Sequence, residues 1–179
     1  LAARVGELLA PLPVRMDREW GLDHGTWSVL AHVYPAADVP VVQLSIDAGR
    51  PPQFHYDIGR RLAGLRDEGV LIMGSGNVVH HLGLLRRNAE AVPYPWAAEF
   101  DARVRAAIED GDHQALVDYA ALGDAARLSV PTPEHYLPLL YVLGAQRPGD
   151  RVDFITQGIE LASISMLSFS LGSYLGSAR

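Results

Sequence analysis

Two apolar runs on either side of a helical pattern restrict the fold of this chain more than any other feature. The runs are VPVVQLSID, Val39 to Asp47, and VLIM, Val70 to Met73. Both are rich in Val, Ile and Leu with little polar alternation, as in strands that are covered on both faces. A helical pattern from Pro51 to Glu68 separates them. A strand, a helix and a second strand in this order imply a parallel pair joined by a right-handed crossover.

We therefore expect the strands around Val41 and Val70 to be neighbours in one sheet, with Ile46 and Met73 near the same edge. The whole pattern predicts an α/β fold: a mostly parallel central sheet with helices on both faces, closing with a C-terminal antiparallel strand pair. The other expected elements are helices at 1–10, 25–34, 95–109, 113–120 and 131–145, a short strand at 13–17, and strands at 151–158 and 161–172.

Size and composition limit the classes of partner. The chain has 179 residues, of which 49% are hydrophobic, which suits one domain with a real core. Its net charge of -6 argues against nucleic acid, because phosphate binding needs a basic face. The absence of cysteine excludes disulfides and thiolate sites and fits a reducing, cytoplasmic setting. The apolar tail from Leu161 to Leu175 is shorter than the ~20 residues of a membrane helix, so we expect a buried strand and no membrane contact.

Histidines gather at three turns or helix starts. His80 and His81 follow the second apolar run in GSGNVVHHL, after glycines that let the backbone bend. His24 lies in LDHGTW, next to a capping Asp, and His135 lies in PTPEHYLP, next to Glu134. In open α/β sheets, ligands bind outside the carboxyl ends of strands, where His80 is expected. Each stretch also has a purely structural interpretation, as a turn or a capped helix start with surface side chains.

The chemistry of these residues points to a metal or to acid–base catalysis without naming a reaction. Histidine is the commonest metal ligand and a common acid or base near neutral pH. A nitrogen-rich site with a carboxylate nearby suits Zn(II) or non-haem Fe(II). There is no HExxH motif and no serine nucleophile elbow. Of the remaining histidines, we expect His32 inside a helix, and His55 and His113 on helix surfaces.

Five blocks carry a family resemblance: WGLDHGTWSVL, VPVVQLSID, GSGNVVHHL, PYPWAAEF and PTPEHYLPLLYVLGA. In this order and spacing they resemble the class III extradiol ring-cleavage dioxygenases, in the branch of the 4,5-DOPA-extradiol-dioxygenase-like proteins. The resemblance implies an α/β sandwich that uses Fe(II), or is found with Zn(II), to open a catechol ring with O₂. It also implies that residues 1–179 form one domain, equivalent to the C-terminal two-thirds of the family's catalytic domain.

The resemblance also implies roles for particular residues. His80 and His135 match the metal-facing histidines, and His24 matches the acid or base beside the metal. His80 could instead act mainly as acid or base. Glu134 is a lesser candidate ligand, because a carboxylate completes the metal site in the related protocatechuate-type enzymes. His81 should face packing or solvent, since two adjacent residues on a turn cannot both point into one small site.

The chain departs from the family pattern at its N-terminal side. The family's HGSP-type turn and SAHW-type strand end, which hold two further metal histidines, are absent from this sequence. The first helix, from Leu1, has an apolar stripe and no preceding cap. We therefore expect a missing N-terminal segment or a complementary chain.

Other functions are compatible with the same residues. The chain could be a non-catalytic or decayed α/β module, or a partner subunit, that keeps its histidines as inherited structure. A weaker alternative is a zinc hydrolase that uses a metal-bound water. The substrate within the catechols stays open between DOPA, caffeate-like compounds and smaller diols.

Overall fold

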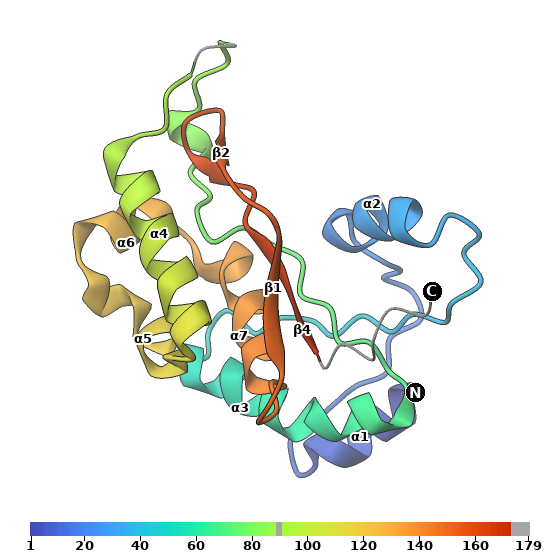
Figure 1. Ribbon diagram of the computed structural model, residues 1–179. Coiled ribbons are helices and arrows are strands. Elements are labelled where there is room, and N and C mark those ends of the chain that lie inside the picture. The colour runs from blue at the N-terminus through green and yellow to red at the C-terminus, as the bar shows by residue number, and fades with distance from the viewer. Residues whose placement is uncertain (89–90, 173–179) are drawn as a thin grey trace, which may run out of the picture.

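The computed structural model describes residues 1–88 and 91–172. These residues form a mixed α/β fold in which helices dominate (Figure 1). In chain order the elements are α1 (Ala2–Leu9), α2 (His24–Val33), α3 (Pro52–Leu62), η1 (Ala63–Glu68), η2 (Leu82–Leu84), α4 (Pro95–Asp110), α5 (His113–Val117), η3 (Tyr119–Leu122), α6 (Asp124–Ser129), η4 (Pro133–His135), α7 (Leu137–Gly144), β1 (Arg151–Thr156), β2 (Ile159–Glu160), β3 (Ile164–Ser165) and β4 (Ser168–Gly172).

The main core lies where α4, α6 and α7 meet, behind the ribbon of β1 and β4 (Figure 1). On α4, the four-residue apolar spacing places Phe100, Val104 and Ile108 in this core, each with no exposed surface. From α7, Leu140 and Leu143 pack against them. The long helix expected from the sequence is thus confirmed, and its inward face is the one that the spacing predicts.

Two glycines let α3 and α7 pack backbone against backbone. A Cβ atom on Gly59 would lie 2.2 Å from the carbonyl oxygen of Tyr141, and one on Gly144 would lie 2.2 Å from that of Tyr56. Real Cβ atoms do not come so close to a carbonyl oxygen, so both positions require glycine. Since α3 also packs on α1, this contact ties the main core to the smaller cluster around Leu9 and Leu62.

The strand pairings within 1–88 and 91–172 are antiparallel. β1 pairs with β4 and β2 with β3, while His80 forms an isolated antiparallel bridge with Ile164 of β3. The expected C-terminal antiparallel pair is therefore confirmed, with the expected strand at 161–172 divided into β3 and β4. Residues 173–175 of the apolar tail lie outside the described residues.

The central parallel sheet expected from the sequence is not formed by the described residues. The segments 39–47 and 70–73 are extended, but neither is a strand or pairs with the other, and the expected strand at 13–17 is not formed either. Leu44 and Ile72 pack on the cluster between α1 and α3, whereas Val41 is 41% and Leu71 67% exposed. The apolar runs thus have one covered side and one open side, and no described strand pairs with them.

Helix α2 is equally open. It has no buried residue, and Trp27, Val29 and Val33 are all exposed. Figure 1 shows it standing apart from the layer of α3 to α7. The sequence correctly predicts the helix, but none of its residues is buried. No helix among 1–88 and 91–172 combines the length and apolarity needed to cross a membrane.

The α3–α7 contact generates a prediction with a matched control. Gly59→Ala forces a Cβ into the backbone of α7, so we expect a loss of about 1–3 kcal/mol in the free energy of unfolding, the usual cost of overpacking. Gly64→Ala changes a helical glycine with open space around it, and should be neutral or stabilising by up to ~1 kcal/mol. Urea unfolding followed by circular dichroism measures both; equal effects would contradict the close contact.

Candidate functional site

The segment Gly74–His81 lies against the start of α7 at backbone distance. A Cβ on Gly74 would lie 2.6 Å from the carbonyl oxygen of Pro138, and one on Gly76 would lie 2.1 Å from that of His135. Neither glycine has a positive φ. Neither glycine is required by a left-handed backbone conformation; a side chain at either position would collide with the segment that carries His135.

Backbone hydrogen bonds fix this segment on both sides. The N–H of Asn77 donates to the carbonyl of His135 at 2.9 Å, and the N–H of His80 donates to that of Ser129 at 2.8 Å. On the other side, the N–H of His81 donates to the carbonyl of Ser163 at 3.1 Å. The loop is thus held between the start of α7, the end of α6 and the β2–β3 hairpin.

The imidazole rings of His80 and His135 stack on each other. Their centroids are 3.5 Å apart and their planes differ by 14°. Burial lowers the pKa of both rings, and the neighbouring ring of His135 lowers the pKa of His80 further. Two cations at this distance would repel each other strongly. Both effects favour the neutral imidazole, which is the form that binds metals or accepts protons.

Glu134 contributes a carboxylate beside this pair. Its Oε1 accepts a hydrogen bond from the Thr132 hydroxyl at 2.7 Å. Burial favours the protonated acid, but that bond, a backbone bond and the nearby His135 and His80 rings together lower the pKa of Glu134. The Glu134 carboxylate in turn opposes the fall in the pKa of both rings. A negative charge thus lies near both rings, where it would favour a cation bound to them.

The helix expected over 131–145 is broken before its main part. Residues 133–135 form a 3₁₀ turn, and α7 begins only at Leu137. Pro138 has no N–H for the carbonyl of Glu134, as the sequence indicates. Thr132 precedes this turn, but its hydroxyl bonds to the Glu134 side chain and not to a backbone N–H of the turn. This break places the Glu134–His135 pair on a separate turn facing His80.

His24 reaches the same region from α2. It is the first residue of that helix, capped by Asp23, whose carboxylate accepts from the N–H of Thr26 at 3.1 Å. His24 is near enough to His135 to lower the pKa of that ring, and a Cβ on Gly25 would lie 3.7 Å from the Ser75 hydroxyl. The three turns identified in the sequence therefore approach one another, although their chemical roles remain predictions.

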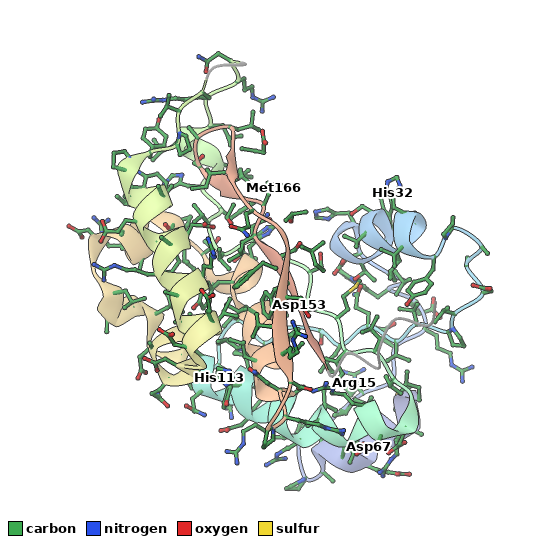
Figure 2. The ribbon with its side chains drawn as sticks, in the orientation of Figure 1. Arg15, His32, Asp67, His113, Asp153 and Met166 are labelled. Carbon is green, nitrogen blue, oxygen red and sulfur yellow. The ribbon has the colours of Figure 1, made fainter. Side chains whose placement is uncertain are left out.

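The other histidines lie elsewhere. His81 turns toward Trp96, with ring centroids 6.0 Å apart, and its buried Nδ1 meets no partner within the described part of the chain. His32 lies on α2 as expected (Figure 2). His113 is half-buried and bonds to the Tyr56 hydroxyl, so it is not a simple surface residue.

His55 also contradicts the sequence interpretation. The apolar spacing of its helix assigned it to the surface, but it has no exposed area and its Nδ1 lies 2.8 Å from the Tyr141 hydroxyl. Its Nε2 is buried without a partner among the residues described. A histidine between two apolar positions of α3 gives no sequence signal of this burial, which comes from the close approach of α7.

A metal would find only part of a ligand set in this chain. Among 1–88 and 91–172, no group of three His, Asp or Glu side chains is arranged to hold a metal ion. The neutral rings of His80 and His135 fit the donor type that Fe(II) and Zn(II) prefer. Stable protein sites for these ions need three or more protein ligands, so the described residues fit a fraction of a centre.

Comparisons with known proteins agree on one family. Residues 1–171 match the family described as the catalytic LigB subunit of aromatic ring-opening dioxygenase. The chain is 49% identical over 176 residues to 4,5-DOPA dioxygenase extradiol of Escherichia coli K12 and 38% identical over 158 residues to the protein of that name from Beta vulgaris. It covers 65% and 59% of these relatives, which cover 96% and 87% of it.

A solved structure shows the same fold. The crystal structure of an uncharacterized protein from Escherichia coli K12 superimposes with a TM-score of 0.86 at 48% identity. The match covers 93% of this chain and 70% of the other. The chain spans less than two thirds of the length of the curated relatives from Escherichia coli and Beta vulgaris.

The buried histidines generate a pH prediction. Burial lowers the pKa of His55, His80 and His135 below 6.5, so each binds fewer protons folded than unfolded. Stability therefore rises with pH in this range and is lost as the pH falls through 6.5 toward the folded values. We expect His55→Asn, which stays neutral, to flatten the pH dependence of the free energy of unfolding between about pH 7 and pH 5. Denaturant unfolding at several pH values measures it; an unchanged slope would contradict this account.

Proposed function

Because this chain belongs to the LigB family of aromatic ring-opening dioxygenases, we propose that it forms part of a metal-dependent enzyme that opens a catechol ring with O₂. The observation that carries the proposal is the stacked, neutral pair of His80 and His135 beside Glu134. The relatives named 4,5-DOPA dioxygenase extradiol supply the reaction class. DOPA or a related aromatic diol is the proposed substrate.

We assign His80 and His135 to the metal. Both are neutral and lie on turns fixed by backbone bonds, so their nitrogens can be offered without first losing a proton. Glu134 lies close enough to compensate the charge of a cation. When bound, Fe(II) or Zn(II) would supply a Lewis-acidic centre at which catechol and O₂ meet already oriented. An Fe(II) centre needs a compartment that keeps iron reduced, so we propose the cytoplasm.

Proton transfer is assigned to His24 and His80. A neutral imidazole can take the proton that a catechol hydroxyl loses on binding and return it later in the reaction. If His80 binds the metal, its other ring nitrogen already carries a proton and cannot accept a second one, so His24 takes the catechol proton. If His80 does not bind the metal, it can act as the acid or base itself. His24 sits at the start of a helix with no buried residue, where a small movement of α2 would bring it toward the stacked pair.

We propose that a further polypeptide segment, continuous with this chain or separate, completes the site. Three features of the described residues support it: the donor set lacks a third ligand, the segments 39–47 and 70–73 pair with no strand, and several of their apolar side chains, Val41 and Leu71 among them, are exposed. An extended strand along them would satisfy backbone groups and cover Val41 and Leu71. The segment 70–73 leads directly into the loop that carries His80.

The metal prediction follows from the incomplete ligand set. We expect this chain alone to bind Fe(II) or Zn(II) weakly or not at all, because two ligands hold a metal far less well than three or four. Joined to the part of the Escherichia coli relative that has no counterpart here, it should bind about one metal. Isothermal titration and metal analysis after dialysis measure both. Tight stoichiometric binding by the 179 residues alone would show that the ligands have been miscounted.

The second prediction separates the adjacent histidines. In the completed protein, His80→Ala should abolish catechol cleavage, since a lost ligand removes the metal and a lost acid or base costs ~10²–10⁴ in rate. His81→Ala should keep most activity, because that ring faces Trp96. The measurement is absorbance of the yellow ring-opened semialdehyde per bound metal, with circular dichroism as the folding control.

Three outcomes would redirect this assignment. An inactive His81→Ala with an active His80→Ala would reverse the roles of the pair. Metal binding by the completed protein without ring opening for any catechol, combined with ester or amide hydrolysis, would favour the hydrolase. No metal binding at all by the completed protein would favour a non-catalytic module.

A further inference from the structure

A chain of hydrogen bonds links the two stacked histidines to the C-terminal hairpin through Asn77. The backbone N–H of Asn77 donates to the carbonyl of His135 at 2.9 Å, and its side-chain amide donates to the carbonyl of Ser165 at 2.8 Å. The Ser165 hydroxyl donates in turn to the Asp101 carboxylate on α4. One residue therefore joins the turn of His135, strand β3 and, through β3, helix α4.

The same strand holds His80 from the other side. Ile164 of β3 forms a bridge with His80, and the N–H of Ser165 donates to the carbonyl of Val79 at 2.9 Å. Ser165 is 1% exposed and also accepts, at its hydroxyl, the N–H of Leu167 at 3.0 Å. The position of β3 thus decides where the backbone of His80 lies, and Asn77 ties that position to His135.

We propose that Asn77 is a positioning residue that holds the His80 and His135 rings in their stacked arrangement, and that the Asp101–Ser165 pair anchors the strand to which Asn77 is bonded. Functional side chains must be held within roughly 0.5 Å of their working geometry, and residues that support ligands are worth about 10–100-fold in metal affinity. His80 and His135 come from segments far apart in the chain, so their separation depends on such cross-links.

The role of this network in catalysis rests on the proposed function, but its role in keeping the His80 and His135 rings stacked does not. The first measurement therefore uses the metal-free chain. Nuclear Overhauser contacts between the ring protons of His80 and His135, and their mutual ring-current shifts, report the stacking directly. They stay informative even if the protein proves to be no dioxygenase.

The variant that tests the proposal is Asn77→Asp. It keeps the shape of the side chain but removes the donor, leaving a carboxylate facing the carbonyl of Ser165. We expect the inter-ring contacts to be lost or strongly reduced while the helices remain folded. Asp101→Asn keeps an acceptor for the Ser165 hydroxyl and should preserve the contacts, whereas Asp101→Ala should weaken them.

Two controls separate positioning from general stability. Gln53→Glu makes the same amide-to-acid change on the exposed face of α3, where the Gln53 amide donates to Asp57, and should leave the rings unchanged. Val104→Ala opens a cavity in the core and should lower stability by a few kcal/mol, roughly, while the rings stay stacked. If Asn77→Asp does not fold, Asn77→Ser, which retains a shorter donor, takes its place and should show a smaller loss of the same contacts.

A second readout separates this inference from the proposed function. In the completed protein, Asn77→Asp should lower Zn(II) affinity by about 10–100-fold. Unchanged inter-ring contacts in folded Asn77→Asp or Asn77→Ser would overturn the positioning role. If folded Asn77→Asp loses the inter-ring contacts, and the completed protein with Asn77 unchanged never binds metal, the positioning role is upheld and the proposed function is refuted.

Discussion

The backbone contact of α3 with α7 at Gly59 and Gly144 is the constraint on which the rest of the structure depends. Helix α7 continues from the turn that carries His135, and α3 lies between the two extended apolar segments of the chain. A side chain at either glycine would push the helices apart, because the colliding atoms are backbone carbonyls that cannot rotate away. This contact therefore helps to fix how the turn that carries His135 lies relative to the segment that leads to His80.

The same principle operates a second time at the histidines. Gly74 and Gly76 let the loop approach the start of α7 until Asn77 can bond to the His135 carbonyl. Close approach removes water, and lost hydration disfavours a charged imidazole. Stacking then disfavours charge on both rings together. The geometry and the neutral state of the pair thus have one cause, which is backbone packing without intervening side chains.

The sequence predicts local features well and non-local ones poorly. The helix at Pro95–Asp110 follows from four-residue apolar spacing, and its inward face is correct. The described residues form no parallel sheet, because strand pairing depends on residues distant in the chain and an apolar run indicates only that burial is favourable. The two glycines near His80 are recognised, but their purpose is not, since nothing in GSGN indicates which backbone lies opposite.

The histidines show the same division. That His24, His80 and His135 each follow a turn is visible in the sequence, and the family resemblance identifies them as related. That two of the rings stack at 3.5 Å depends on the break before α7 and on β3, neither of which has a local signal. His55 is misassigned for a similar reason. Its burial comes from α7, where Tyr141, whose hydroxyl contacts His55, lies 86 residues away in the chain.

Unpaired backbone groups and an incomplete set of metal ligands occur in the same part of the structure. In the described residues, the segments 39–47 and 70–73 have no strand partner, and the stacked pair of His80 and His135 has no third metal ligand. The segment 70–73 continues directly into the loop that Asn77 fixes. A further strand that pairs with 70–73 would therefore be hydrogen-bonded to the stretch of backbone that leads to His80. The same addition would satisfy the backbone, cover Leu71 and carry donors toward the stacked rings. Folding and assembly of the site would then be one event, because the polypeptide that completes the sheet would be the one that completes the metal's ligands.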